Sequence, residues 1–167
     1  MEEIINKVAQ SSLEIFDLED YFPTDNFIIF DISQFLKDGF LLIEKDFREA
    51  VKNYDFSFYN NQVIGLQCST DAILPSWTFL IVATQLVGIA KKVIQSNEKD
   101  FIIANYQENI SKIDFSMYQN KAVILKGCSK KPVPQEVYTL VLNHLQPFAK
   151  SIMYGEACSA VPVFKKK

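Results

Sequence analysis

Three cysteines are the residues of this chain best suited to chemistry, and each of them directly precedes a serine. The pairs are Cys68-Ser69, Cys128-Ser129 and Cys158-Ser159. Thiolates select zinc, copper(I) or iron–sulfur centres, and three protein ligands with an open fourth position are typical of a catalytic or delivery site. The serines could donate hydrogen bonds to the sulfur atoms. The pattern therefore predicts a metal site holding zinc, iron or an iron–sulfur cluster, although it lacks the CxxC spacing of common zinc sites.

Asp71 follows Cys68 by three residues, so its carboxylate is a candidate fourth ligand, with a loop or helix-capping role as the alternative. Two other functions stay open. In the first, the protein is a thiol-dependent enzyme or sulfur carrier, and Cys128 is its reactive residue because Lys130 and Lys131 would favour the thiolate. In the second, the cysteines are inert and pack as small hydrophobes in an interaction module or a homodimer.

The elements that must position these cysteines follow from an internal repeat with a spacing of 59 residues. The segment YDFSFYNNQVIGLQCS at residues 54–69 resembles IDFSMYQNKAVILKGCS at residues 113–129, with one residue inserted before the second Cys-Ser pair. Pro75 and Pro134 continue the repeat. In each copy, the pattern predicts a short helix, a turn at DFSxY, a strand, the Cys-Ser loop, a second helix and a second strand.

The predicted elements are helix 45–53, strand 62–66, a helix after Pro75 and strand 92–95 in the first copy, and helix 106–112, strand 122–125, a helix after Pro134 and strand 151–154 in the second. Because strand–helix–strand connections join parallel strands, the sequence predicts an α/β fold around a largely parallel sheet. Ligands bind at the carboxyl edge of such sheets. Each cysteine follows the end of a predicted strand, so we expect the three thiols to meet at that edge.

A chain of 167 residues suits a single domain. We expect residues 1–40 to form an N-terminal extension, residues 41–98 to form the first copy, and residues 99–167 to form the second copy with the C-terminal tail. Within the extension, we expect a helix at residues 1–11, an extended segment at 16–23 and a strand at 26–32.

The composition argues against several classes of partner. A net charge of −3 gives no attraction to nucleic-acid backbones, and the longest apolar run, residues 77–89, is too short to span a membrane. No secretory leader is evident, and an odd number of cysteines without a leader favours a reducing cytoplasm. The motifs GxGxxG, GxSxG and HExxH do not occur in the sequence.

Other polar and aromatic side chains have structural interpretations. His144, the only histidine, lies in mid-helix where its repeat partner is Gln85, so we expect it at the surface or the edge of the core. Trp77 is expected to pack against the core. Asp55 and Asp114 occupy equivalent DFSxY turns and are expected to accept hydrogen bonds from nearby backbone amides.

Five long motifs, NKVAQSSLEIFDLEDYFP, EKDFREAVKNYDFSFY, CSTDAILPSW, KGCSKKPVP and SIMYGEACSAVPVFKKK, cover most of the chain. On these motifs, the chain resembles an uncharacterised bacterial family known as domain of unknown function 2480. The resemblance implies that the three Cys-Ser pairs are the family's cysteine motifs, and it implies no activity. Genes of the family lie near those for iron–sulfur cluster assembly, so the resemblance implies iron–sulfur assembly proteins as partners.

Overall fold

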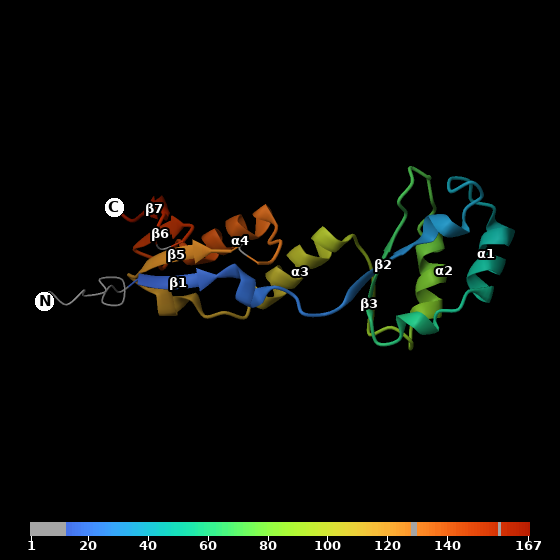
Figure 1. Ribbon diagram of the computed structural model, residues 1–167, viewed down its shortest axis with the longest axis horizontal. Coiled ribbons are helices and arrows are strands. Elements are labelled where there is room, and N and C mark those ends of the chain that lie inside the picture. Colours follow the sequence, from blue (N-terminus) through green and yellow to red (C-terminus); the bar gives the residue numbers. More distant parts are fainter. Residues whose placement is uncertain (1–12, 128–129, 157) are drawn as a thin grey trace, which may run out of the picture. The chain divides into compact units, whose positions relative to one another are not determined.

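A computed structural model of the chain describes residues 13–127, 130–156 and 158–167 (Figure 1). The chain divides into two compact units, of which unit 1 comprises Met1–Pro23 with Ile102–Lys167 and unit 2 comprises Thr24–Phe101. Unit 2 therefore holds the first copy of the repeat and unit 1 the second. The single domain over residues 1–167 stays a prediction, and the predicted helix at residues 1–11 lies outside the described residues.

Unit 2 is built on a parallel three-stranded sheet with the order β2-β3-β4. Its strands are β2 (Phe27–Asp31), β3 (Val63–Gln67) and β4 (Lys92–Gln95), and its helices are α1 (Glu44–Asn53) and α2 (Trp77–Leu86). Phe30, Ile64 and Leu66 from the sheet pack with Phe47 of α1 and Val82 of α2. The core of unit 2 thus lies between one face of the sheet and these two helices (Figure 1).

Unit 1 is built on a four-stranded sheet with the order β1-β5-β6-β7. Its strands are β1 (Leu13–Asp17), β5 (Ala122–Lys126), β6 (Ser151–Tyr154) and β7 (Val161–Lys165). The first three strands run parallel, and β7 is antiparallel to β6. Helix α4 (Gln135–Leu145) joins β5 to β6 and buries Val137, Val141 and Leu145 along one face, as its helical periodicity predicts.

The two units pair their strands in the same register. Phe30 of β2 lies opposite Leu66 of β3, and Phe16 of β1 lies opposite Leu125 of β5, the repeat partner of Leu66. The next pairs are Asp31 with Gln67 and Asp17 with Lys126. Each copy of the repeat therefore takes one strand from the N-terminal region, where FD at residues 16–17 recurs at residues 30–31.

The structure confirms the α/β class and the parallel strand–helix–strand units, with the strands divided between two sheets instead of one. Strands 92–95 and 151–154 have the predicted bounds, and the strand predicted at 26–32 is β2. The segment predicted to be extended at 16–23 is so at residues 16–17, which end β1, whereas Leu18–Tyr21 form a 3₁₀ helix. Strand β7 was not predicted.

The helix predicted at residues 106–112 begins earlier, as α3 (Glu98–Ile110), which crosses the boundary between the two units. Its start has a physical cause in the sequence NEKD. Asn97 Oδ1 accepts the amide hydrogen of Asp100 at 2.9 Å, and the Asn97 side-chain amide donates to the Asp100 carboxylate at 2.9 Å. This reciprocal capping stabilises the first turn.

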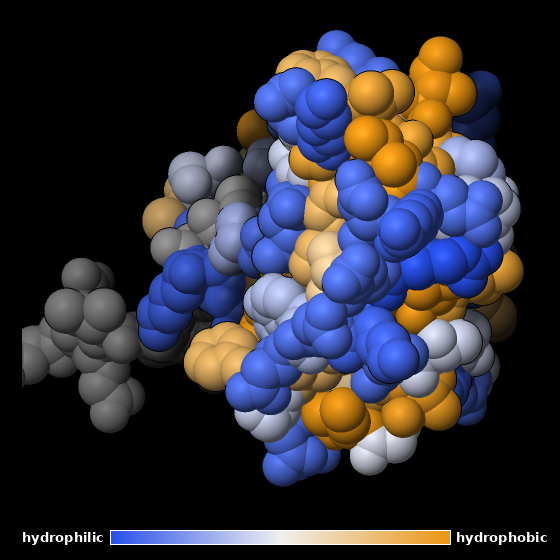
Figure 2. Space-filling view, turned by 90° about the vertical axis from the view of Figure 1, so that its right-hand side faces the viewer, coloured by the Kyte–Doolittle hydropathy of each residue, from blue (hydrophilic) through white to orange (hydrophobic). Residues whose placement is uncertain are grey.

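The surface of unit 2 shows no continuous apolar face in the view of Figure 2, where hydrophilic residues separate several hydrophobic areas. The exposed apolar side chains of this unit are spread along the chain. They include Phe40, Phe58, Ile73, Leu80 and Val87. Within the described residues, no helix has the length and the apolar character needed to cross a bilayer.

Gly65 of β3 offers a test of the packing in unit 2. The ring of Phe27 lies against Gly65 and stacks on Phe101 with a centroid distance of 4.3 Å, and a Cβ at Gly65 would contact that ring and approach the Ser96 carbonyl oxygen to 2.7 Å. We expect Gly65→Ala to lower the free energy of unfolding by about 1–3 kcal/mol because of overpacking. Urea denaturation followed by circular dichroism measures this change.

The repeat supplies the control for this prediction. The unit 1 counterparts of Phe27 and Gly65 are Leu13 and Ile124. Leu13 is smaller than Phe27, and Ile124 is larger than Gly65. In a Phe27→Leu background, Gly65→Ala should therefore cost clearly less than in the wild type. An equal cost in both backgrounds would contradict the packing argument.

Candidate functional site

Cys68 directly follows β3 and packs, half-buried, against the core of unit 2. Its Sγ lies 3.3 Å from Thr70 Oγ1, and this hydroxyl donates to the Gly39 carbonyl oxygen at 2.6 Å. A hydroxyl has one hydrogen, so the Thr70 oxygen can then only accept from Cys68. Cys68 therefore contributes to the packing of unit 2, as cysteines often do.

Ser69, the serine after this cysteine, ties the loop to the end of β2. Its backbone amide donates to Asp31 Oδ1 at 3.1 Å, and its hydroxyl donates to Asp31 Oδ2 at 2.5 Å. Asp31 Oδ1 also accepts the amide hydrogen of Ser33 at 3.0 Å. Burial raises the pKa of Asp31, but the hydrogen bonds from Ser69 and Ser33 outweigh burial and lower it. Ser69 therefore donates its hydrogen bonds to a carboxylate, whereas the sequence had suggested the cysteine sulfur as the acceptor.

Unit 1 anchors the equivalent loop with different groups. Asp17, the counterpart of Asp31, accepts the amide hydrogen of Glu19 at 3.0 Å. Glu19 Oε1 in turn accepts from the backbone amides of Lys130 at 2.7 Å and Lys131 at 3.4 Å. Lys131 Nζ donates to the Glu19 carbonyl oxygen at 3.1 Å and lies 5.5 Å from the centroid of the Phe22 ring. The chain after Cys128 is thus held at the end of β1, while Cys128 and Ser129 themselves lie outside the described residues.

A cleft of about 350 Å³ lies at the carboxyl ends of β5 and β6 in unit 1. It is lined by Lys126, Gly127, Tyr154, Gly155, Glu156, Ser159 and Val161. The Gly155 amide donates to the Leu125 carbonyl oxygen at 3.2 Å, and the Ser159 amide donates to the Glu156 carbonyl oxygen at 2.9 Å. Gly155 has a φ of +115°, a conformation that favours glycine, so the turn after β6 depends on it.

Lys126 places a positive charge in this cleft. Its Nζ lies 3.5 Å from Glu156 Oε1 and 3.5 Å from Asp17 Oδ2. The Glu156 carboxylate, and after it the Asp17 carboxylate, raise the pKa of Lys126, so its ammonium stays charged at neutral pH. Cys158, between Glu156 and Ser159 in sequence, is exposed to solvent. At this end of the cleft, one ammonium is therefore paired with two carboxylates.

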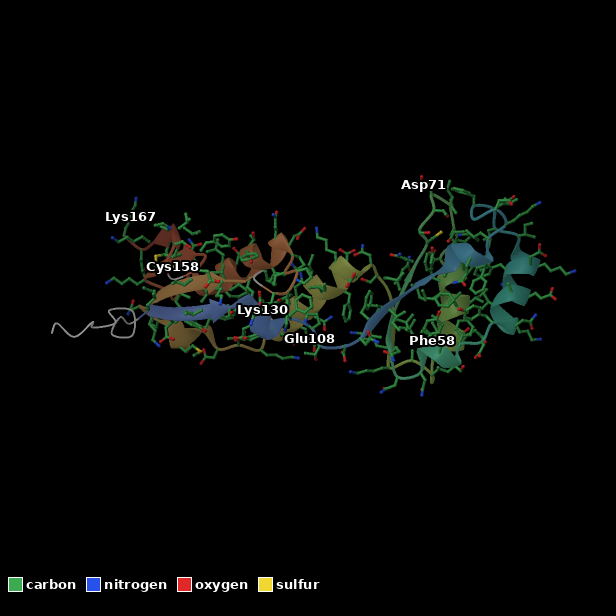
Figure 3. All side chains as sticks on the ribbon, viewed as in Figure 1. Phe58, Asp71, Glu108, Lys130, Cys158 and Lys167 are labelled. Carbon is green, nitrogen blue, oxygen red and sulfur yellow. The ribbon has the colours of Figure 1, made fainter. Side chains whose placement is uncertain are left out.

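The candidate ligands Cys68, Cys128, Cys158 and Asp71 are divided between the units. Cys68 and the exposed Asp71 belong to unit 2, and Cys158 belongs to unit 1 (Figure 3). Within residues 13–127, 130–156 and 158–167, no three histidine, cysteine, aspartate or glutamate side chains are close enough to share a metal ion. The joint three-cysteine site stays a prediction. The cleft of unit 1 is lined by Gly127 and Ser159, which are the sequence neighbours of Cys128 and Cys158.

Sequence reasoning missed the charged residues around these loops, which are Asp17, Glu19, Asp31, Lys126 and Glu156. One signal could have identified the aspartates, because each ends an FD pair that closes an N-terminal strand. Lys126 is the repeat partner of Gln67, and Glu156 is the repeat partner of Asn97. Comparison of the two copies at these positions would have shown that only one copy carries charges there.

The comparisons with known proteins identify a family and no activity. The family model described as a protein of unknown function (DUF2480) matches residues 2–166. No curated protein and no solved structure matches the chain at a significant level.

The anchoring role of Asp31 can be tested by its dependence on pH. We expect Asp31→Asn to lower the free energy of unfolding by about 1–2 kcal/mol at pH 7, because the hydrogen bonds from Ser69 and Ser33 lose a charged acceptor. The folded pKa of Asp31 lies below its unfolded value of about 3.9. The stabilisation is therefore complete above about pH 5 and is lost as the pH falls through the lowered pKa.

Urea denaturation of the wild type and Asp31→Asn between pH 7 and pH 3 measures this effect. The difference between the two proteins should shrink towards acid pH. Asp71→Asn, which alters an exposed carboxylate of the same loop, should change the stability by less than about 0.5 kcal/mol. A difference between wild type and Asp31→Asn that is independent of pH would contradict the role of Asp31.

Proposed function

The chain belongs to the DUF2480 family of proteins of unknown function, and we propose that it is a metal-binding protein with Cys128 and Cys158 as thiolate ligands. The observation that carries the proposal is the cleft at the carboxyl edge of β5 and β6. Gly127, which lines the cleft, directly precedes Cys128, and Ser159, which also lines it, directly follows Cys158. Two of the three Cys-Ser motifs therefore have a member or a sequence neighbour that lines one cavity, at the edge where parallel sheets bind ligands.

The charges of the cleft support a soft divalent ion. Two thiolates and the Glu156 carboxylate would bring three negative charges to a zinc or iron(II) ion, leaving the centre with a charge of about −1. The Lys126 ammonium, 3.5 Å from both Glu156 Oε1 and Asp17 Oδ2, would reduce the negative charge around the ion. Glu156 thus takes the place that the sequence had suggested for Asp71 as the oxygen ligand.

The proposed donor set favours transfer over permanent storage. Two cysteines and one carboxylate leave a coordination position open, as in sites that exchange their ligand. Such a site suits the delivery of zinc, iron or an iron–sulfur cluster to a partner, with iron–sulfur assembly proteins as the proposed partners. A reducing cytoplasm, the proposed location, would keep the thiols available.

Metal analysis of the protein purified without oxygen tests this proposal. We expect the wild type to carry roughly one equivalent of zinc or iron, and Cys128→Ser and Cys158→Ser each to lose most of it, because thiolates hold the ion. Cys68→Ser is the matched control, since Cys68 lies beside Thr70 and the core of unit 2, and it should retain the metal. Less than about a tenth of an equivalent in every sample, or an equal loss in Cys68→Ser, would reject the two-cysteine site.

A reactive thiol is the second candidate function, and the position of Lys126 favours it. An ammonium beside a cysteine lowers the thiol pKa and increases the fraction of reactive thiolate. Lys126 lines the cleft that adjoins Cys128 and Cys158, whereas the corresponding position in unit 2 is the neutral Gln67. A sulfur carrier or thiol-dependent enzyme would use one of these two cysteines, with Cys128 as the residue that the sequence favours.

Alkylation kinetics test this second function. In the metal-free protein at pH 7, Cys128 or Cys158 should react with iodoacetamide at least about tenfold faster than Cys68, whose sulfur packs on the core. Lys126→Gln, which introduces the residue of unit 2, should slow the fast thiol. Lys121→Gln removes an ammonium at the opposite end of β5 and should leave the rate unchanged. Uniformly slow labelling of all three cysteines would count against a reactive thiol.

A further inference from the structure

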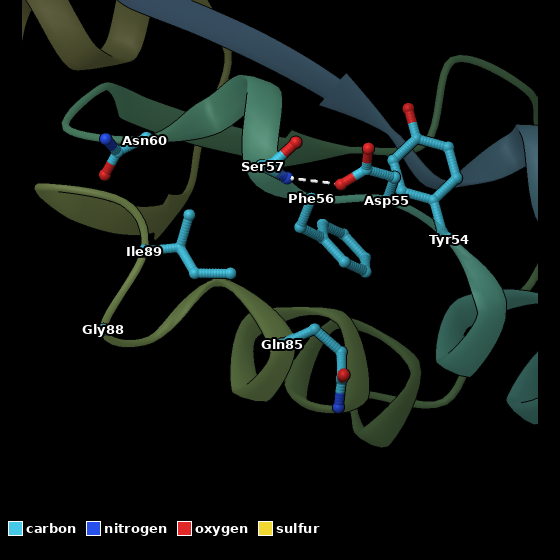
Figure 4. Close-up of a pocket in the computed structure, with 8 residues that line it drawn as sticks. All are labelled: Tyr54, Asp55, Phe56, Ser57, Asn60, Gln85, Gly88 and Ile89. Atoms are coloured by element: carbon cyan, nitrogen blue, oxygen red, sulfur yellow. Dashed lines mark hydrogen bonds between the residues drawn. The ribbon is translucent and has the colours of Figure 1, made fainter.

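A second cavity lies in unit 2, and no cysteine is among the described residues that line it. It has a volume of about 490 Å³, within the range of small-ligand sites, and lies between the DFSxY turn and the end of α2 (Figure 4). Its lining comprises Tyr54, Asp55, Phe56, Ser57, Asn60, Gln85, Gly88 and Ile89. The Asn61 amide donates a hydrogen bond of 2.9 Å to the Ile89 carbonyl oxygen, and this bond links the two sides of the cavity.

The cavity carries a negative charge. Asp55 is the single carboxylate among the eight lining residues, and neither lysine nor arginine is one of them. Asp55 Oδ1 accepts the amide hydrogen of Ser57 at 2.9 Å, and the backbone and hydroxyl hydrogen bonds from Ser57 lower the pKa of Asp55. The carboxylate is therefore ionised at neutral pH. The amide side chains of Asn60 and Gln85 add carbonyl oxygens that can accept further hydrogen bonds.

Aromatic rings form another part of the lining. Phe56 stacks on Phe30 with a centroid distance of 5.6 Å and an angle of 27°, and Tyr54 packs against Phe56 at 4.9 Å. The Tyr54 hydroxyl shares a hydrogen bond of 3.2 Å with the Tyr59 hydroxyl, which holds the Tyr54 ring in place. Aromatic faces attract cations, most strongly where a carboxylate lies nearby and water is partly excluded.

Unit 1 shows what the same framework can hold. There, Phe115 stacks on Phe16 at 5.8 Å, as Phe56 does on Phe30, and the ring of His144 stacks on Phe115 at 5.1 Å with an angle of 19°. His144 is the repeat partner of Gln85. Two more partners are larger in unit 1, since Pro147 and Phe148 stand where unit 2 has Gly88 and Ile89. In unit 1, a planar nitrogen ring thus stacks on the phenylalanine whose counterpart in unit 2, Phe56, lines the cavity.

From this comparison, we propose that the cavity of unit 2 binds a guanidinium group, which stacks near Phe56 and Tyr54 and pairs with the Asp55 carboxylate. A guanidinium is planar like the imidazole of His144, carries the charge that complements Asp55, and has N–H donors in a fixed fork that suits a carboxylate. The group can belong to a free arginine-like metabolite or to an arginine side chain of a protein partner. The proposal is independent of the metal and thiol functions assigned to unit 1.

Binding of N-acetyl-arginine amide to the full chain, followed by NMR spectra of the ¹⁵N-labelled protein, tests the proposal. We expect saturable shifts of the Ser57 and Gly88 amide signals with an affinity of about 1 mM, typical of a ligand of this size. The corresponding citrulline derivative is neutral and nearly isosteric. It should bind at least about tenfold more weakly, because the charged pair with Asp55 is lost.

The repeat provides matched variants. Asp55→Asn and Asp114→Asn change the same turn position in the two units, and asparagine can still accept the amide hydrogen that holds the turn. Asp55→Asn should weaken binding at least about tenfold, and Asp114→Asn should leave it unchanged. The double variant Gln85→His with Ile89→Phe introduces the side chains of unit 1 and should abolish binding by filling the cavity.

The peptide Gly-Gly-Arg-Gly-Gly distinguishes the two sources of the group. Binding more than about tenfold tighter than that of N-acetyl-arginine amide would indicate a protein partner, and equal binding would indicate a free metabolite. The proposal is overturned if neither probe gives saturable shifts, or if the citrulline derivative binds as well as the arginine derivative. It is also overturned if Asp55→Asn and Asp114→Asn have the same effect.

Discussion

The parallel register between an N-terminal strand and the first strand of each repeat determines the rest of both units. In this register, the buried Phe16 and Phe30 face the cores, while the aspartates that follow them, Asp17 and Asp31, end at the carboxyl edge. A slip by one residue would turn the phenylalanine of a strand to the opposite face and withdraw the aspartate from the loop. Core packing and the polar contacts at the edge are therefore specified together.

The recurrence of serine after cysteine acquires a physical explanation in unit 2. Ser69 donates two hydrogen bonds to Asp31, and Cys68 is directed to Thr70 and the core. The serine therefore positions the loop, and the cysteine contributes packing. In unit 1, the Glu19 carboxylate holds the backbone amides of Lys130 and Lys131. The two units thus anchor equivalent loops with different carboxylates, Asp31 in unit 2 and Glu19 in unit 1.

Local patterns identified most helices and strands, and long-range pairing decided the features that they missed. The runs at 92–95 and 151–154 follow helices that recur in both copies of the repeat, so their positions could be predicted. Strand β1 has the sequence LEIFD, in which Glu14 pairs with Lys121 and Ile15 is exposed, as is typical of an edge strand. Its partner, β5, lies near the other end of the chain, and no local signal connects them. The same reason explains why the division of the strands between two sheets could not be predicted from the repeat alone.

Two copies of one framework have diverged in the charges that they place at equivalent positions. At the carboxyl edge, unit 1 has Lys126 and Glu156 where unit 2 has the neutral Gln67 and Asn97. The units also differ at the DFSxY turn. In unit 1, His144 stacks on Phe115, whereas in unit 2 a cavity lies beside Phe56 and Asp55. Because the framework itself is retained, as the equal strand registers show, these substitutions are not needed to maintain the fold. These substitutions lie at a cleft in one unit and at a cavity in the other.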